Sequence, residues 1–180
     1  VPLHEELRLA YATAEDRSKF RIASENPMKN PLVHAIVRRH SDDLILVIGQ
    51  YLDQLKQLSR ELNAPLITGQ VPNKEREELY ARFKRGDLKV LVVSKVANFA
   101  VDLPDATVAI QVSGTFGSRQ EEAQRLGRIL RPKSDGSAAY FYSLVTRETK
   151  EQEFAAKRQL FLTEQGYRYE IIHAEEFAGA

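Results

Sequence analysis

The residues best suited to chemistry are arginines in Ser118–Lys133, which reads SRQEEAQRLGRILRPK. Good helix formers continue through Leu130, and Pro132 is expected to stop the helix after Arg131. Guanidinium groups that converge on one point suit a polyphosphate, because they neutralise the charge that spreads over a phosphoryl group during its transfer. The first candidate chemistry is therefore charge neutralisation at a nucleotide.

This predicted helix has two different faces. At about 100° per residue, Gln124, Arg128 and Arg131 fall on one narrow stripe, with Arg125 on its flank. The opposite side carries an alanine and two leucines. Gly127 precedes Arg128, and since a glycine inside a helix costs on the order of 1 kcal/mol, it usually marks the close approach of another group. The helix therefore presents an apolar back and a guanidinium-rich front.

A solvated charged face is the ordinary alternative, because charge on a surface helix is the default. Glu121 and Glu122 are spaced to pair with arginines one turn further on. Three features favour a binding face: both glutamates precede the arginines, a glycine interrupts the arginine run, and a glycine-bearing loop, Gly114–Gly117, leads into the helix. We interpret the front as a binding face.

The elements that must position this helix begin near Asp43, where short apolar runs start to alternate with amphipathic helical patterns. Strands are expected at residues 44–48, 65–68, 88–93, 106–112, 138–144 and 167–172. Further helices are expected at residues 52–62, 73–84 and 150–165. Apolar strands separated by helices of this length imply an α/β fold, with a mostly parallel sheet and helices on both faces.

The first forty residues follow a different pattern. Residues 3–25 are predicted to be helical and strongly charged, and a second helix is expected at Leu32–His40. The buried stripe of this second helix is expected to contain Leu32, Ile36 and Val37. We expect residues 1–40 to link or pack against a neighbouring domain and residues 41–180 to form the main domain. The chain opens on Val1 rather than Met, which indicates a piece of a longer protein.

Composition excludes several classes of protein. The 180 residues suit one domain, and the absence of cysteine excludes disulfides and thiolate metal sites. The four histidines show no metal-ligand spacing, so no metal site is expected. No apolar run approaches the roughly 18 residues of a membrane span. Since the net charge is only +1, any contact with nucleic acid must come from local patches.

Small or polar residues follow three of the predicted strands. In a parallel sheet, function gathers at the carboxyl ends of the strands, where backbone amides and hydroxyls can hold phosphates of a nucleic-acid strand. The candidates, together with Arg125 of the helix, are Gly49, Gln50, Thr68, Gly69, Ser94 and Lys95. At any one site, glycine or serine merely ending a strand is the alternative. Three such ends along one edge favour a nucleic-acid track.

The run QRLGRILR, Gln124–Arg131, resembles motif VI of superfamily 2 helicases. That motif has His or Gln, then Arg, an apolar residue, Gly and Arg, and a further Arg three residues on. With GTFGSRQEEA before it and RPK after it, the run is similar to the XPB branch of DNA repair and transcription helicases, in a bacterial or archaeal member.

Upstream segments carry the same resemblance in the same order. Leu44–Gln50 resembles motif IV, and Ile67–Gly69 with Glu75 and Arg76 resembles the next element that binds the nucleic-acid backbone in this family. The resemblance implies that these segments contact DNA.

Residues 94–104, SKVANFAVDLP, resemble motif V. Asp102 stands at the position of the characteristic acid of that motif, which in the family lies near the ATP ribose, while the Ser94 end meets the DNA backbone. Ala100 stands where many relatives have glycine, and this departure puts the local backbone conformation in doubt.

The sequence has no GxxxxGK[ST] phosphate loop, and no Asp-Glu pair that follows a strand and could hold magnesium. The resemblance therefore implies the second RecA-like lobe of a two-lobed motor, a P-loop NTPase-type fold without the Walker A loop. ATP and Mg²⁺ are then held mainly by a first lobe. The implied catalytic arginine fingers are Arg128 and Arg131, and the implied nucleotide contacts are Gln124, Asp102 and Gly127.

The implied function is that of a 3′–5′ ATP-dependent DNA helicase in nucleotide excision repair or transcription, with this lobe inactive alone. The implied partners are DNA, the N-terminal lobe, and a repair nuclease or a transcription and repair complex. If the source is prokaryotic, the implied location is the cytoplasm, in association with the nucleoid. Two alternatives stay open. One is a non-catalytic recruitment module, and the other is a double-strand DNA translocase.

Overall fold

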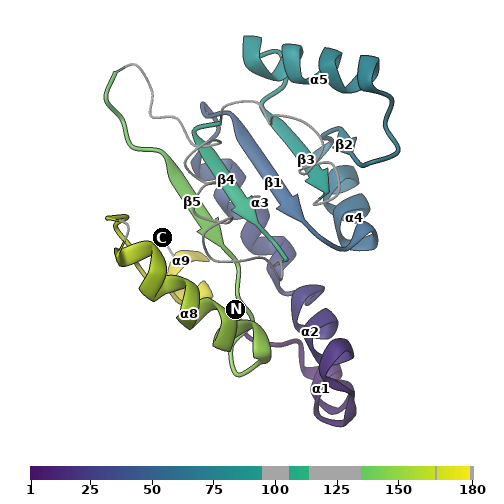
Figure 1. Ribbon diagram of the computed structural model, residues 1–180, viewed down its shortest axis with the longest axis vertical. Coiled ribbons are helices and arrows are strands. Elements are labelled where there is room, and N and C mark those ends of the chain that lie inside the picture. Colours follow the sequence, from purple (N-terminus) through teal and green to yellow (C-terminus); the bar gives the residue numbers. More distant parts are fainter. Residues whose placement is uncertain (95–105, 114–134, 165, 179–180) are drawn as a thin grey trace.

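The computed structural model describes residues 1–94, 106–113, 135–164 and 166–178. Within these ranges the strands form one sheet in the order β2-β3-β1-β4-β5 (Figure 1). The strands are β1 Ile45–Gly49, β2 Leu66–Ile67, β3 Val90–Ser94, β4 Val108–Gln111 and β5 Tyr140–Ser143. All pairings between them are parallel, which confirms the predicted α/β class.

Helices connect and cover these strands. They are a 3-10 turn at Glu5–Leu7, α1 Arg8–Thr13, α2 Asp16–Ser24, α3 Lys29–Arg39, α4 Leu52–Leu62, α5 Asn73–Arg85, α8 Lys150–Glu164 and α9 Ala174–Ala178. Asn63 ends α4 with a φ of 49°, and Gly86 ends α5 with a φ of 84°. These left-handed residues turn the chain sharply out of each helix.

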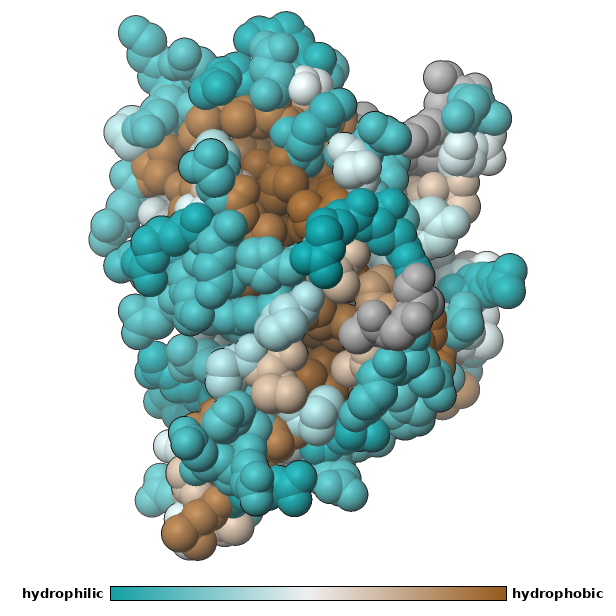
Figure 2. All heavy atoms as spheres, turned by 180° about the vertical axis from the view of Figure 1, so that it is seen from behind, coloured by the Kyte–Doolittle hydropathy of each residue, from teal (hydrophilic) through white to brown (hydrophobic). Residues whose placement is uncertain are grey.

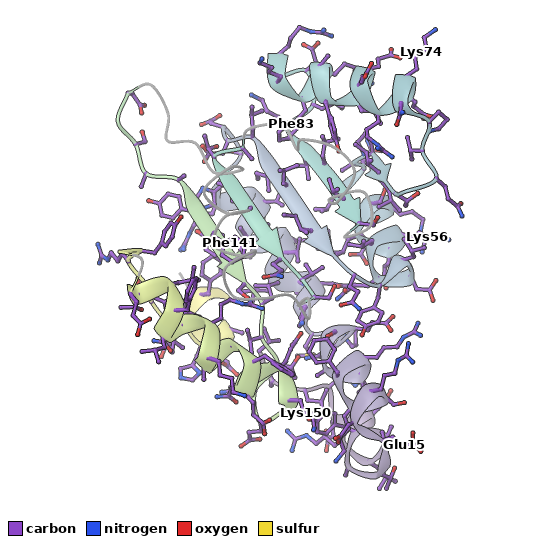
Figure 3. The ribbon with its side chains drawn as sticks, viewed as in Figure 1. Glu15, Lys56, Lys74, Phe83, Phe141 and Lys150 are labelled. Carbon is purple, nitrogen blue, oxygen red and sulfur yellow. The ribbon has the colours of Figure 1, made fainter. Side chains whose placement is uncertain are left out.

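The sheet is buried on both faces, which is why its central strands are apolar runs. In β1, all five residues are buried. Ile45 and Val47 share a core with side chains of α3, α4 and α9, whereas the alternate residues Leu46 and Ile48 share a second core with Phe83 of α5. Phe83 lies between α5 and the sheet in the stick view (Figure 3). Two cores, one on each face, therefore hold the sheet in place.

The helix α3 belongs to the first of these cores. Its most buried apolar side chains are Val33 and Ile36, at 0% and 1% exposure, while Leu32 and Val37 are only partly buried. Of the expected stripe, Ile36 is fully buried and Leu32 and Val37 pack only at its flanks, because Val33, which the prediction omitted, lies at the centre of the buried face. The domain boundary expected at residue 40 stays a prediction.

The prediction of a strand at residues 167–172 is wrong. Between Gly166 and His173 the described backbone forms no strand, and the side chains of Ile171 and Ile172 are 68% and 44% exposed. Alternating aromatic and β-branched residues favour a strand only where its apolar face is buried and its backbone finds a ladder partner. The segment instead leads into α9, whose Phe177 enters the first core.

Charged and polar side chains cover most of the surface seen from behind, and apolar side chains gather there in a recess (Figure 2). Among the helices of the described ranges, none has the length and apolar character needed to cross a bilayer.

Candidate functional site

The carboxyl ends of four neighbouring strands lie along one edge of the sheet (Figure 1). Ile67 of β2 pairs with Val93 of β3, and Gly49 of β1 pairs with Ser94. At β4, the N–H of Val112 donates a 2.9 Å hydrogen bond to the carbonyl of Ile48. The residues of this carboxyl edge are Thr68, Gly69, Ser94, Gly49, Gln50 and Ser113. The parallel register thus brings together segments that are distant in the sequence, as the pattern of strand ends predicts.

Gly49 is required at the end of β1 by close packing. A Cβ atom at this position would lie 2.7 Å from Leu55 Cδ2, 2.9 Å from Ser113 Oγ and 2.9 Å from Val112 Cγ2. Real Cβ atoms essentially never approach other atoms that closely, so any side chain here would force the packed side chains of Leu55, Ser113 and Val112 to shift. The glycine therefore has a structural reason beyond ending a strand.

Ser113 joins the ends of β1 and β4, and the sequence reasoning missed it. Its Oγ accepts a 2.6 Å hydrogen bond from the backbone N–H of Gln50, and its side chain is fully buried. The backbone amide of Gln50 is thus committed within the protein, which leaves the side chain of Gln50 to reach a ligand. The signal that selected Ser94, a small polar residue after an apolar strand, would also have selected Ser113.

Two polar side-chain atoms at this edge are buried without a hydrogen-bond partner. They are Ser94 Oγ, in a residue that is 2% exposed, and Gln50 Oε1. A buried polar atom left unpaired costs about 1–3 kcal/mol, so its presence needs an explanation such as a missing ligand. A hydroxyl and an amide oxygen at the end of adjacent strands can hydrogen-bond to a sugar hydroxyl, and the hydroxyl can also donate to a phosphate.

The turn after β2 is fixed by an arginine from α5. The guanidinium of Arg76 donates through Nη2 to the carbonyls of Val71 at 3.2 Å and Thr68 at 3.5 Å, and the residue is only 4% exposed. Within the turn, the Gln70 N–H donates to Thr68 Oγ1 at 3.3 Å. Gly69 is exposed at the tip. Arg76 therefore shapes the backbone of this turn from inside, rather than offering its charge to solvent.

The N-terminal helices reach the same edge through Tyr51, which follows Gln50. The guanidinium of Arg21 on α2 lies 5.2 Å from the centroid of the Tyr51 ring and is paired with Glu25. Burial, followed by the nearby carboxylate of Glu25, raises the pKa of Tyr51 above its ordinary value. The phenol is thus neutral at physiological pH, and it offers a ring face rather than a charge beside the edge.

The remaining predicted site residues lie outside the described ranges. They are Lys95, Asp102, Gln124, Arg125, Gly127, Arg128 and Arg131. In the described part of the chain, no cluster of histidines and carboxylates of the size needed to hold a metal ion is found.

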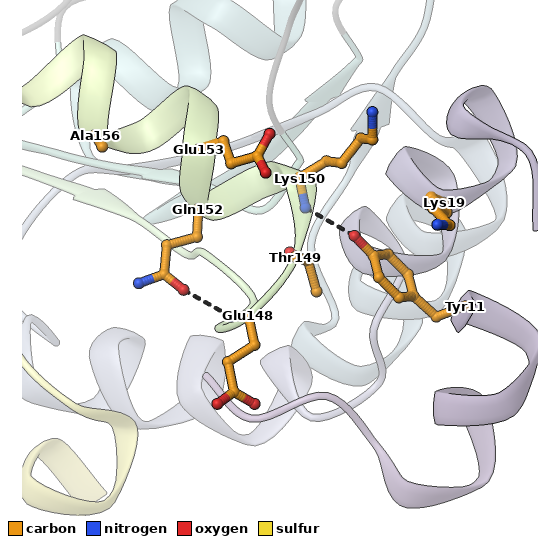
Figure 4. Close-up of a pocket in the computed structure, with 8 residues that line it drawn as sticks. All are labelled: Tyr11, Lys19, Glu148, Thr149, Lys150, Gln152, Glu153 and Ala156. Atoms are coloured by element: carbon orange, nitrogen blue, oxygen red, sulfur yellow. Dashed lines mark hydrogen bonds between the residues drawn. The ribbon is translucent and has the colours of Figure 1, made fainter.

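A separate pocket of about 450 Å³ lies between the N-terminal helices and the start of α8 (Figure 4). Tyr11 accepts a 2.8 Å hydrogen bond from the Lys150 N–H, and the Glu148 N–H donates to Gln152 Oε1 at 2.6 Å. Two lysines and two glutamates line the pocket, so both charges are present. The Lys150 ammonium is already paired with Asp16 at 3.0 Å. This pocket contains none of the predicted site residues and has no excess of one charge.

Comparison with solved structures identifies the class of fold. The C-terminal domain of the DEAD-box protein Dbp5 superposes with a TM-score of 0.62 at 15% identity, over 78% of this chain and 82% of that domain. The helicase domain of Pyrococcus furiosus Hef gives a TM-score of 0.54 at 19% identity, over 74% of this chain and 28% of that one. The fold of the sheet and its flanking helices is therefore RecA-like.

The family follows from the sequence. The family model described as the ERCC3/RAD25/XPB C-terminal helicase matches residues 1–178, and the chain belongs to this family. It is 55% identical to the "DNA 3'-5' helicase XPB" of Kineococcus radiotolerans and to that of Mycobacterium tuberculosis, each over 99% of this chain. It is 36% identical, over 95% of its length, to a yeast protein named as the XPB/SSL2 helicase/translocase subunit of general transcription and DNA repair factor IIH. The chain spans about a third of the length of the two bacterial relatives.

Proposed function

We propose that this chain is the C-terminal motor lobe of an ATP-dependent DNA helicase with 3′–5′ polarity. The observation that carries the proposal is the family match over residues 1–178, supported by bacterial relatives named as DNA 3′–5′ helicases. The absence of a phosphate loop from the sequence agrees with a lobe that works against a nucleotide-binding partner. ATP and Mg²⁺ are then held mainly by an N-terminal RecA-like lobe of the same protein.

In this proposal the carboxyl edge holds the DNA backbone. Ser94 supplies a hydroxyl that lacks a partner within the protein and can donate to a phosphate, Gln50 supplies its side-chain amide group, whose N–H can donate in the same way, and the Thr68–Gly69 turn supplies exposed backbone. Lys95 and Arg125 add positive charge. Contacts of this kind recognise phosphate and sugar rather than bases, so binding should be insensitive to DNA sequence and should weaken as salt increases.

The arginines of the helix predicted within Ser118–Lys133 supply the catalytic charge. Closure of the two lobes brings Arg128 and Arg131 against the γ-phosphate, where an arginine finger is worth a factor of about 10³ or more in turnover. Gln124, Asp102 and Gly127 contact the nucleotide. Repeated closure and opening then moves the protein along one strand, because each lobe holds the backbone in turn.

The test is DNA-stimulated ATP turnover by the full-length parent and its Arg131→Ala variant, with nucleotide binding measured for both. Arg60→Ala is the matched control, because Arg60 is an exposed arginine on α4. We expect Arg131→Ala to lose turnover by about 10³-fold while it still binds nucleotide, and Arg60→Ala to match the parent. A parent without turnover, or an Arg131→Ala variant that keeps it, would favour a non-catalytic recruitment module.

A double-strand translocase is the second candidate, because the yeast relative is named as a helicase/translocase subunit. The two activities separate experimentally. A helicase releases a labelled strand from a forked duplex, whereas a translocase displaces a third strand from a triplex without opening the duplex beneath it. The name of the yeast relative also supports a role in DNA repair or transcription within a larger complex. A repair nuclease as a partner, and a cytoplasmic location on nucleoid DNA in a prokaryote, belong to the same proposal.

A further inference from the structure

Lys29, at the start of α3, is a charged side chain with no exposure to solvent. Its ammonium donates to Val112 O at 2.6 Å, to Glu151 Oε2 at 2.9 Å and to Ser24 O at 3.1 Å. All three ammonium hydrogens therefore have an acceptor. Replacing a buried ion pair with uncharged side chains often leaves stability unchanged or raises it, so stability alone does not explain a buried charge. The groups that the ammonium holds in place explain better why a charged lysine is buried here.

One of its acceptors is the backbone at the end of β4. Val112 directly precedes Ser113, whose Oγ accepts the hydrogen bond from the Gln50 N–H. On the other side of the same residue, the Val112 N–H donates to Ile48 O of β1. The ammonium therefore fixes the carbonyl of Val112, while β1 fixes its N–H. Together these bonds set where the Ser113 hydroxyl meets Gln50.

The other two acceptors tie this strand end to distant elements. The Ser24 carbonyl also accepts a 2.8 Å hydrogen bond from Gln54 Nε2, in the first turn of α4 just after Gln50. Glu151, in the first turn of α8, accepts a 2.9 Å hydrogen bond from the Thr146 N–H through its second oxygen. One cation thus joins α2, the end of β4 and α8, and it reaches α4 through a shared acceptor.

We propose that Lys29 is a positioning residue for the carboxyl edge, because its ammonium holds the Val112 carbonyl and thereby the Ser113 and Gln50 contact. Lys29 does not touch DNA or nucleotide. It acts through Val112, and its loss should loosen the end of β4 without removing any group that binds a ligand. The inference rests on the proposed function of this edge as a DNA-backbone site.

The alternative is that Lys29 only neutralises Glu151, and the choice of variant separates the two. Lys29→Met alone leaves a buried carboxylate unpaired, which is strongly destabilising. The double variant Lys29→Met/Glu151→Gln removes both charges, and the glutamine oxygen still accepts from the Thr146 N–H. Lys150→Met/Asp16→Asn is the matched control, since it removes a lysine–aspartate pair whose side chains are 33% and 81% exposed and whose bond does not involve β4.

The experiment uses the full-length parent and measures urea unfolding, ATP turnover as a function of DNA concentration, and nucleotide affinity. We expect Lys29→Met/Glu151→Gln to unfold cooperatively and to bind nucleotide as the parent does. The DNA concentration for half-maximal turnover should rise about three- to tenfold, the change that loss of one hydrogen bond produces. The control should show no rise. An unchanged DNA concentration in the stable double variant would overturn the proposal.

Hydrogen exchange separates this proposal from the proposed function. The Gln50 amide should exchange about three- to tenfold faster in Lys29→Met/Glu151→Gln than in the parent, even if the parent hydrolyses no ATP. Unchanged protection of that amide would overturn the positioning role whatever the activity. If the double variant does not fold, Lys29→Arg is measured in the same way, since it keeps the charge while its longer side chain displaces Val112. The Gln50 amide of Lys29→Arg should also exchange faster than that of the parent. An unchanged exchange rate in this variant would contradict the proposal.

Discussion

The backbone N–H of Gln50 donates a 2.6 Å hydrogen bond to the Oγ of Ser113, across 63 residues of sequence. This bond joins the carboxyl ends of β1 and β4 where their regular ladder stops. Ser113 is fully buried, so bulk water has no access to replace its hydroxyl. The position of Gln50 at the edge therefore depends on a side chain from the next strand.

Ser113→Ala should destabilise the protein, because the Gln50 N–H is left without an acceptor at a cost of about 1–3 kcal/mol. Ser41→Ala is the control, since Ser41 is an exposed serine whose change should stay within about 0.5 kcal/mol. Urea unfolding of both variants measures the difference. Equal stabilities would mean that the Gln50 amide finds another acceptor.

Gly49→Ala should cost about 1–3 kcal/mol, because the new Cβ overlaps Leu55, Ser113 and Val112. The closest clash is with Leu55 Cδ2, at 2.7 Å. A double-mutant cycle with Leu55→Ala should therefore show coupling of about 1 kcal/mol. The double variant should lose less unfolding free energy than the two single variants lose together. Strict additivity in urea unfolding would show that the backbone moves instead of the leucine.

Arg76→Met should loosen the turn after β2, because the carbonyls of Thr68 and Val71 lose their guanidinium donor. Amide hydrogen exchange of residues 68–71 should accelerate more than that of β1, as expected for a local opening. Arg82→Met is the control on the same helix, with an exposed side chain. If both variants leave the turn equally protected, other contacts hold it.

The fold was predictable from the sequence where burial dictates pattern. The run expected as a strand at residues 44–48 is observed at Ile45–Gly49, because a strand covered on both faces must be apolar throughout. Parallel order then places Gly49 beside Ser94 without any knowledge of side-chain contacts. The gathering of the strand ends follows from topology alone, so that part of the candidate site was accessible to sequence reasoning.

Contacts between distant residues were not predictable in the same way. A lysine in a helix is expected on the surface, and nothing near Lys29 indicates that its partner is Glu151, 122 residues further on. The prediction of a strand at residues 167–172 was wrong because local sequence pattern was the only evidence for it. Its local pattern is strand-like, but strand formation depends on an available sheet edge, which local pattern does not report.

Glu61 on α4 should contribute stability that depends on pH. The hydrogen bond from His34, with Nε2 and Oε2 2.8 Å apart, lowers the pKa of Glu61 below its ordinary value of 4.5. The unfolded chain therefore binds more protons below pH 4.5, so this contribution is present above that pH and is lost as pH falls through the folded pKa. Both side chains are about one-third exposed, so screening limits the effect to below about 1 kcal/mol.

The measurement is urea unfolding of the parent and Glu61→Gln from about pH 6 to about pH 3. The parent should be more stable at the upper end, and the difference should vanish at the lower end. Glu78→Gln, a change at an exposed glutamate on α5, is the control and should show no such trend. A difference that persists unchanged into acid would assign the effect to packing rather than to charge.

Tyr80→Phe should stabilise the protein by about 1 kcal/mol, because the Tyr80 hydroxyl is buried without a hydrogen-bond partner. Tyr142→Phe is the matched change and should destabilise the protein, since Tyr142 Oη lies 2.7 Å from His40 Nε2 and this hydrogen bond is lost.

Burial raises the pKa of Tyr80 above 10.0, so the folded state holds its proton more tightly and stability falls as pH rises above that value. Tyr80→Phe removes this loss, and its advantage in urea unfolding should therefore grow at alkaline pH. A Tyr80→Phe variant as destabilised as Tyr142→Phe would show that the Tyr80 hydroxyl has a partner in solution.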